Sequence, residues 1–340
     1  MTTATVIIVG GGPAGSSCAA ELRRHGLDAV VLDQATFPRE KLCAGWITPQ
    51  VLAELELSPE DYPRPLTRHT RLRFSFRRVP LTVPTRQYAV RRSEFDAFLL
   101  ERAGVPVHRH RVHHIERAGD EYVVDGAYRC RYLVGAGGTH CPVYRALFAA
   151  RLPRRPDDLI VTLEEEFRYD WKDGTCRLAY FDRGLPGYAW YLPKRDGYLT
   201  VGIGGKQAAL RRRGTTIKAH WRRWVERLAS KGWVREHEFR PSGHSYYIRP
   251  AAGRGATAGG AAGVPEEPAR HGNVFIVGDA AALATRDMGE GIGPAVASGR
   301  RAARAIAGLE PYSLEDIGRW SIPQILRPRS GEPNGVRRPE

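Results

Sequence analysis

The sequence has no long apolar run and no paired cysteines. No apolar stretch reaches the roughly 18 residues that a membrane-spanning helix needs, which excludes an integral membrane protein. The N-terminus enters a strand-like pattern without a positively charged leader, so we expect no secretory signal. The five cysteines are scattered without a CxxC pair, and predict neither a disulfide scaffold nor a metal site. We therefore expect a reduced, cytoplasmic protein.

Lysine is scarce, although the chain is strongly basic. Only six of the 52 basic residues are lysine, and the formal net charge is +15. A positive field favours polyanionic partners, such as a substrate with a diphosphate or phospholipid head, or peripheral contact with an anionic membrane. A chain that is basic without such a partner remains an equal alternative. We expect no nucleic-acid partner.

The 340 residues show no internal repeat and begin with a βαβ pattern. Residues 4–9 and 28–33 read as buried parallel strands, with a helix over residues 13–25 between them. Near the other end, a buried strand over residues 273–277 precedes a helix over residues 293–307. The tail, residues 327–340, is polar and rich in proline and glycine, so we expect disorder there.

The middle of the chain predicts a second sheet. A hairpin over residues 72–76 and 79–83 is followed by a helix over residues 93–103, with Ser93 as its N-cap and Gly104 beyond its end. Turn residues separate the later strands, which are expected at residues 159–168, 176–182, 187–192 and 198–203. We further expect one basic helix over residues 206–231 and a glycine- and alanine-rich loop over residues 251–265.

A glycine motif follows the first strand, with the pattern Gly10-x-Gly12-x-x-Gly15. Gly10 permits a tight turn, Gly12 lets the backbone approach a pyrophosphate, and Gly15 allows close packing of helix and sheet. Asp33 ends the second strand, where a carboxylate can bind ribose hydroxyls. Strand, glycines, helix and acid together predict a dinucleotide site.

A second motif, 277–281 (VGDAA) and 289–292 (GEGI), indicates that the dinucleotide is FAD. A strand ending in Gly278 and Asp279 places a carboxylate beside the ribityl chain or pyrophosphate. Gly289, Gly291 and Ile292 would present backbone N–H groups where a flavin ring carries negative charge. The alternative is an ordinary helix cap by Asp279.

Further motifs make the chain resemble the geranylgeranyl reductase family of FAD-dependent oxidoreductases, within the larger group that shares the p-hydroxybenzoate hydroxylase fold. The resemblance covers roughly residues 4–307. Its motifs are 41–45 (KLCAG), 92–96 (RSEFD), 188–193 (YAWYLP) and 201–204 (VGIG). It implies an α/β fold, in which a Rossmann-like FAD-binding domain carries an inserted substrate domain with a mixed or antiparallel sheet.

The expected domains are discontinuous. Residues 1–70, 88–150 and 270–310 would form the FAD-binding domain. Residues 71–87 and 151–269 would form the substrate domain. Residues 311–340 would be a C-terminal extension.

The resemblance also implies site residues. Arg92 should contact FAD, Val112 should meet the adenine through its backbone, and Cys43 and Ala44 should line the flavin. The other residues expected at the cofactor are Pro13, Ala14, Gln34 and Lys41. Tyr188, Trp190 and Cys43 are the expected catalytic residues. Tyr188 and Trp190 alternate along a strand and so face one side, as a wall over flavin and substrate or as ordinary core aromatics.

The implied activity is reduction of carbon–carbon double bonds in an isoprenoid or other apolar small molecule, with hydride from reduced FAD and a proton from a positioned acid. Tyr188 or a bound water is the expected proton source. NADPH or ferredoxin would be a transient electron donor. Flavin monooxygenases and halogenases share this fold and are the first alternative. A basic nucleic-acid or membrane-binding protein with a vestigial flavin site is the second.

Overall fold

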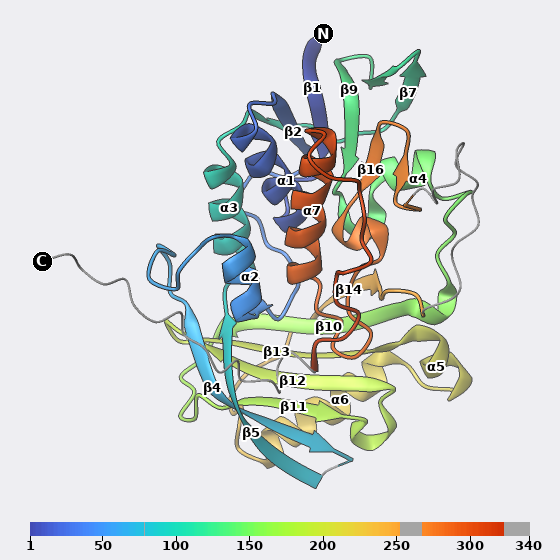
Figure 1. Cartoon of the computed structure of the whole chain (residues 1–340). Helices are drawn as coiled ribbons and strands as arrows, with labels where there is room; N and C mark the ends of the chain where they lie inside the picture. The colour runs from blue at the N-terminus through green and yellow to red at the C-terminus, as the bar shows by residue number, and fades with distance from the viewer. Residues whose placement is uncertain (78, 252–266, 323–340) are drawn as a thin grey trace, which may run out of the picture.

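The computed structural model describes residues 1–77, 79–251 and 267–322. Two eight-stranded sheets lie one above the other, and three long helices stand beside the upper sheet (Figure 1). The fold class predicted from the sequence is confirmed, because the upper sheet is largely parallel and Rossmann-like and the lower one is mixed and largely antiparallel.

The first sheet is built around β1, whose β-branched run from Val6 to Val9 is buried. The strand order is β15-β16-β9-β1-β2-β6, and β7 and β8 extend the sheet beside β9. β1 pairs in parallel with β2 and β9, so the carboxyl ends of all three strands open on the same edge. The strand bounds are β1 Thr2–Val9, β2 Ala29–Asp33, β6 Val107–Arg109, β7 Ile115–Ala118, β8 Glu121–Val124, β9 Tyr128–Gly135, β15 Arg270–His271 and β16 Val274–Ile276.

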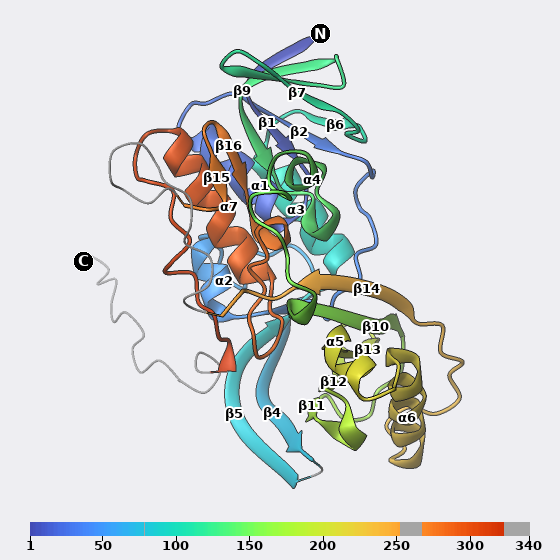
Figure 2. The same ribbon diagram turned by 90° about the vertical axis from the view of Figure 1, so that its right-hand side faces the viewer.

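Helices α1 (Pro13–Arg24), α3 (Arg92–Ala103) and α7 (Ile292–Ile306) lie side by side against this sheet (Figures 1 and 2). α1 and α7 approach closely because Gly299 has no side chain. A Cβ on Gly299 would lie 2.2 Å from the carbonyl oxygen of Ala14. The first and last helices of the described chain therefore pack together. Two shorter helices in this part of the molecule are α2 Pro49–Glu54 and α4 Pro142–Leu147.

The second sheet has the order β14-β10-β13-β12-β11-β4-β5-β3. One face packs on α6 (Ile217–Ser230) through a cluster that includes Val201, Ile203, Trp221 and Trp224, and the other face turns toward the first sheet. The strand bounds are β3 Trp46–Ile47, β4 Thr67–Phe76, β5 Val79–Ala89, β10 Leu159–Arg168, β11 Cys176–Tyr180, β12 Gly187–Lys194, β13 Tyr198–Lys206 and β14 Ser242–Tyr247.

The prediction of one continuous basic helix over residues 206–231 is wrong. The structure has two helices, α5 (Gln207–Arg212) and α6 (Ile217–Ser230). Gly214 takes a left-handed φ of +60°, and the Thr216 hydroxyl accepts a hydrogen bond from Ala219 N, which starts a new helix.

Helix α3 begins one residue earlier than expected, so Ser93 is not its N-cap; Arg91 takes that position. Gly104 ends α3 in the left-handed region, as predicted. The loop expected over residues 251–265 falls, apart from residue 251, outside the described residues, and so does the tail over residues 327–340.

No helix in the described ranges combines the length and apolarity needed to cross a bilayer. The longest of them, α7, has 15 residues.

Candidate FAD and substrate site

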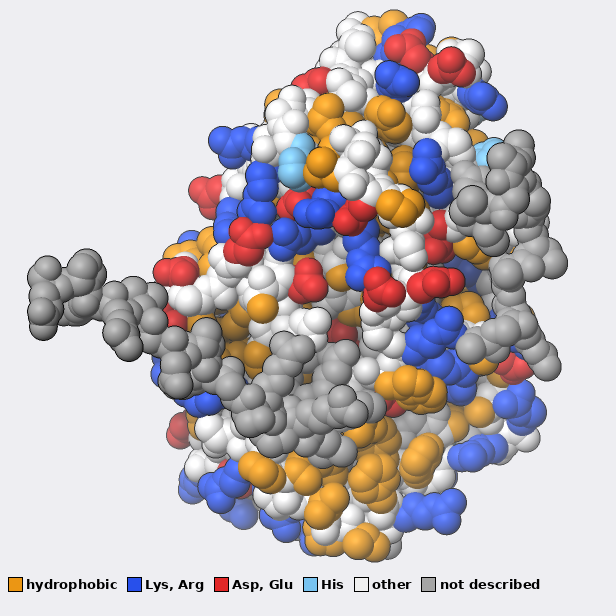
Figure 3. Space-filling view, viewed as in Figure 1, with side chains coloured by type: hydrophobic (Ala, Val, Ile, Leu, Met, Phe, Trp, Pro, Cys, Tyr) orange, Lys and Arg blue, Asp and Glu red, His pale blue; other side chains and the backbone are white. Residues whose placement is uncertain are grey.

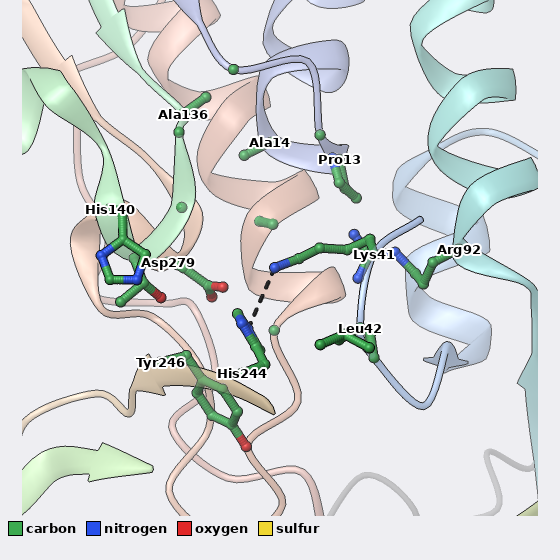
Figure 4. Close-up of a pocket in the computed structure, with 18 of the residues that line it drawn as sticks. Pro13, Ala14, Lys41, Leu42, Arg92, Ala136, His140, His244, Tyr246 and Asp279 are labelled. Carbon is green, nitrogen blue, oxygen red and sulfur yellow. Dashed lines mark hydrogen bonds between the residues drawn. The ribbon is translucent and has the colours of Figure 1, made fainter. Parts of the chain in front are cut away.

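A cavity of about 850 Å³ lies between the two sheets. Its upper wall comes from the carboxyl ends of β1, β2 and β9, and its lower wall comes from β10, β12 and β14. Figure 4 shows Lys41 crossing this space between α1 and the second sheet. The cavity is therefore bordered by both sheets and by segments from the first and the last helix of the described chain.

The glycine motif forms one end of the cavity. Gly10 has a φ of +112°, and a Cβ there would lie 2.5 Å from the carbonyl oxygen of Ala136. A Cβ on Gly15 would lie 1.9 Å from the carbonyl oxygen of Gly10, so the start of α1 sits directly on the end of β1. Gly12 is the N-cap of α1 and faces the cavity. A Cβ on Gly12 would lie 3.5 Å from its nearest neighbour, a side-chain nitrogen of Arg39. The backbone at Gly12 is thus open to a ligand.

Asp33 stands at the end of β2 and is held by two backbone donors. Its Oδ2 accepts from Gly11 N at 2.8 Å, and its Oδ1 accepts from Ala35 N at 2.9 Å. The carboxylate is thereby fixed at the cavity wall, close to the glycine turn. Gln34 and Val112 line the same part of the cavity.

The second motif brings another helix start to the same space. α7 begins at Ile292 after Gly291, and Glu290 accepts a hydrogen bond from Gly293 N at 2.6 Å. No described side chain caps the N-terminus of α1, which opens into the cavity as α7 does. The uncapped start of α1 therefore faces the same cavity as the start of α7, where Glu290 takes one N–H group and the others suit an electron-rich ligand.

Asp279 follows β16 in a short 3₁₀ turn, Gly278–Ala281, and lines the cavity. Burial raises the pKa of its carboxyl, while the nearby cations Lys41, Arg92 and Arg154 counteract that rise. Gly278 lies beneath it with a φ of +58°, and its N–H donates to Ser298 Oγ at 2.9 Å. Gly278 therefore shapes the turn from below.

Lys41 is the central cation of the cavity (Figure 4). Its Nζ lies 3.4 Å from Nε2 of His244. Burial lowers the pKa of Lys41, and the Asp279 carboxylate opposes this. Burial, followed by Lys41, Arg92 and His140, lowers the pKa of His244 to about 3. His244 is thus a neutral imidazole at physiological pH.

Arg92 lies at the first position of α3 and is buried. Its Nε and Nη2 donate to the two carboxylate oxygens of Asp96 at 2.8 and 2.9 Å. This bidentate pair explains why an arginine is tolerated at a helix N-terminus, where the dipole disfavours a cation. Arg92 also lines the cavity, where Cys43 contributes to its electrostatic environment.

Tyr188 and Trp190 project from β12 into the cavity, as their alternation predicts. The Trp190 ring lies over Gly202 of β13, in space that a side chain at Gly202 would fill. A Cβ at Gly202 would fall 2.1 Å from an indole carbon of Trp190. The Tyr188 hydroxyl donates to the carbonyl oxygen of Met288. This bond ties the second sheet to the turn that begins at Gly289.

Sequence reasoning missed Glu164. It lies on β10 directly across β13 from Trp190, since Gly202 pairs with both. Its side chain is 3% exposed and lines the cavity, and its Oε2 has no hydrogen-bond partner among the residues that the structure describes. Burial raises the pKa of Glu164 to about 7, against the opposing charges of Lys194, Lys41 and Arg92. β10 contains three consecutive glutamates, so no local signal distinguished this one.

The structure brings nearly all expected site residues to this one cavity. Gly15 and Gly278 do not line it and instead shape its walls from behind. Lining it are Gly10, Gly12, Pro13, Ala14, Asp33, Gln34, Lys41, Cys43, Ala44, Arg92, Val112, Tyr188, Trp190, Asp279, Gly289, Gly291 and Ile292. The contact of each residue with FAD or substrate stays a prediction.

The residues present fit FAD. The open backbone at Gly12 and the N-termini of α1 and α7 suit a pyrophosphate and an electron-rich ring, and the fixed Asp33 carboxylate suits ribose hydroxyls. The space between them continues to the aromatic wall of β12.

Comparison with known proteins agrees with an FAD site. Residues 3–55 match the family model described as FAD binding domain. Menaquinone reductase of Mycobacterium tuberculosis is 28% identical over 347 residues, covering 92% of this chain and 80% of that protein. Geranylgeranyl diphosphate reductase of Synechocystis is 26% identical over 337 residues, covering 88% of this chain and 74% of that protein.

A solved structure has the same fold. The geranylgeranyl bacteriochlorophyll reductase-like protein of Thermoplasma acidophilum superposes with a TM-score of 0.74 at 20% identity, covering 91% of this chain and 79% of that one. At this identity the match bears on the fold alone.

Proposed function

Because this chain is an FAD-dependent oxidoreductase related to the geranylgeranyl reductases, we propose that it reduces carbon–carbon double bonds in an isoprenoid or other apolar substrate. The observation that carries the proposal is that one end of the cavity is polar and suits a dinucleotide, whereas the other end is largely aromatic. One end has open glycine backbone and two helix N-termini, and the other has an aromatic wall with a buried acid beside it.

In this proposal the expected residues hold FAD along the upper wall. The backbone at Gly10 and Gly12 and the start of α1 receive the pyrophosphate, and Asp33 receives a ribose. Asp279 and the turn from Gly289 to Ile292 lie at the flavin end. The chemistry that bound, reduced FAD supplies is transfer of a hydride to one carbon of the double bond. NADPH or ferredoxin stays the proposed source of the electrons.

The apolar substrate lies against the second sheet. Trp190 and Tyr188 form its wall, and behind them a buried cluster includes Leu72, Phe74 and Leu178. A hydrocarbon chain gains by leaving water for such a surface, whereas a polar substrate would lose its hydrogen bonds to water there. This supports an isoprenoid over a sugar or an amino acid.

Glu164 is the proposed proton donor. The hydroxyl of Tyr188 already donates to Met288, and burial raises the pKa of Tyr188, so its proton is poorly available. A carboxyl with a pKa of about 7 is half protonated near neutral pH, which suits a general acid. Glu164 gives its proton to the second carbon of the double bond and regains one from water, and the substrate gains two hydrogens in all.

Anaerobic reoxidation of the flavin tests the function. The purified protein is reduced chemically without oxygen and then mixed with prenyl diphosphates, prenyl phospholipids or prenylated quinones. We expect one of these classes to restore the oxidised flavin spectrum and to yield a product heavier by two hydrogens. Reoxidation only by oxygen, with a hydroxylated or halogenated aromatic product, would favour the monooxygenase or halogenase alternative. A protein that emerges colourless and releases no FAD on boiling would favour the vestigial-site alternative.

A further inference from the structure

The end of the β4–β5 hairpin exposes a group of large apolar side chains. Phe76 is 42% exposed, Val79 69% and Leu81 54%, and Phe181 from the turn after β11 is 48% exposed. Figures 1 and 3 show the hairpin projecting from the second sheet, with hydrophobic side chains gathered over this end of the molecule. We call these four residues the hairpin tip. Scattered single apolar residues are ordinary on a surface, but a group at one projecting end indicates a contact site.

An aromatic stack connects the hairpin tip to the cavity. Phe76 stacks on Tyr180, with ring centroids 5.2 Å apart, and Tyr180 stacks on Tyr188 at 4.9 Å. The three rings occupy directly paired positions on β4, β11 and β12, so they share one face of the sheet. Tyr188 lines the cavity. A row of stacked aromatic rings therefore runs from the exposed tip to the proposed substrate wall, and its middle ring, Tyr180, is buried.

Exposed arginines flank the tip. The backbone N–H of Arg77 bonds to the Tyr180 carbonyl oxygen, which places Arg77 at the base of the Phe181 turn. Arg213, the residue that follows α5, donates to the Gly184 carbonyl oxygen at 2.6 Å, and Arg223 of α6 donates to the Arg183 carbonyl oxygen at 3.4 Å.

The acids at this end do not cancel these cations. Arg183 pairs with Glu226 at 3.4 Å, and the buried Asp182 pairs with Arg227 at 2.7 Å. Arg77, Arg213 and Arg223 remain as exposed positive charge around the apolar group. An apolar centre with a basic rim matches the interface of an anionic bilayer, where hydrocarbon lies beneath phosphate.

We propose that the hairpin tip docks on an anionic lipid bilayer, and that the aromatic stack leads an isoprenoid chain from the bilayer to the cavity. The tip's apolar side chains enter the level of the lipid headgroups, and the flanking arginines bind lipid phosphates. The second half of this proposal rests on the proposed function, since it needs a lipid-like substrate. The docking itself does not.

Vesicle flotation tests the docking. The FAD-loaded protein is floated with vesicles of phosphatidylcholine alone or mixed with phosphatidylglycerol. We expect binding to the mixed vesicles only, and weakening of that binding as salt is raised. The double variant Val79→Ser, Leu81→Ser is expected to bind about tenfold more weakly, because it removes two exposed apolar side chains of the tip and leaves the aromatic stack intact. The control is Leu309→Ser, which removes an equally exposed apolar side chain (54%) at the end of α7. It should bind like the unchanged protein.

A second measurement separates docking from catalysis. Both variants should turn over a short, water-soluble prenyl substrate at an unchanged rate, whereas with the substrate embedded in anionic vesicles only the hairpin-tip variant should lose activity. Equal flotation of the unchanged protein and the hairpin-tip variant would overturn the docking, whatever the reaction. A dimer in sedimentation that the hairpin-tip variant dissociates, without vesicle binding, would overturn it too and assign the tip to a second copy.

Discussion

The carboxyl of Glu164 shows how a single residue acquires its chemistry from its surroundings. Its neighbour Glu165 points to the opposite face of β10, where it accepts hydrogen bonds from His237 and Arg240 N. Glu164 faces the cavity beside Trp190 instead. Alternation along a strand thus gives two adjacent, identical residues different environments.

Replacement of the proposed acid should slow reduction without loss of FAD. Glu164→Gln is expected to lower kcat about a hundredfold, because a general acid contributes roughly that factor or more. For the unchanged protein, kcat should fall as pH rises above about 7, because the carboxyl loses its proton there. Steady-state kinetics across pH measures both effects. Glu165→Gln is the control and should keep rate and pH profile. A Glu164→Gln variant with the full rate would refute the role.

The same carboxyl should make stability depend on pH. Its folded pKa of about 7 lies above the ordinary glutamate pKa of 4.5. Protonation of Glu164 therefore stabilises the fold fully below pH 4.5, and this stabilisation is lost as pH rises through 7. Urea unfolding should therefore show Glu164→Gln gaining stability relative to the unchanged protein between pH 5 and pH 8, by at most about 3 kcal/mol. If the difference in unfolding free energy between Glu164→Gln and the unchanged protein did not vary with pH, the raised pKa of Glu164 would be contradicted.

At the scale of the element, β13 makes room for the aromatic wall. Gly202 leaves the space that the Trp190 ring fills, and Gly204 separates Tyr188 from Thr162 in the next row. A strand usually avoids glycine, because glycine gains no packing and costs entropy. Here the missing side chains leave room for the Trp190 ring, which would lie 2.1 Å from a Cβ on Gly202 and 3.6 Å from a Cβ on Gly204.

Gly202→Ala should displace Trp190 and damage the substrate wall. We expect at least a tenfold rise in KM for a prenyl substrate and an unchanged FAD content, because the glycine motif lies on the other sheet. Gly243→Ala on β14 is the matched control, since its Cβ would lie 3.7 Å from its nearest neighbour and fits without clash. Kinetics and flavin absorbance measure the two effects. Equal behaviour of the two variants would show that the ring position does not matter.

At the scale of the whole molecule, the cavity joins residues from near the two ends of the chain. The cofactor end is built by the turn after β1 and by the start of α7, held together through the contact of Gly299 with α1. A ligand bound there stabilises both helices together.

FAD should therefore raise the midpoint of thermal unfolding. At a hundred times its dissociation constant, it should stabilise the fold by about 2.7 kcal/mol. In the proposed arrangement, Asp279 and the start of α7 bind the flavin half and Asp33 binds the adenosine half. FMN, which lacks the adenosine half, should therefore shift the midpoint less than FAD at the same concentration. Thermal unfolding followed by circular dichroism measures both. An equal shift with FMN would show that Gly10, Gly12 and Asp33 do not bind the half of FAD that FMN lacks.

The sequence by itself determined the two cofactor motifs, the strands around them and the fold class, because each depends on contiguous residues with a local backbone requirement. Gly10, Gly12 and Gly15 are recognisable without knowledge of any distant partner, and so is the alternation of Tyr188 and Trp190. Only the tertiary structure decided that Glu164 rather than Glu165 faces the cavity, that the basic helix breaks at Gly214, and that Phe76 stays exposed. Each of these depends on which distant strands and helices cover a residue, and burial by distant residues sets both the pKa of a carboxyl and the exposure of a ring.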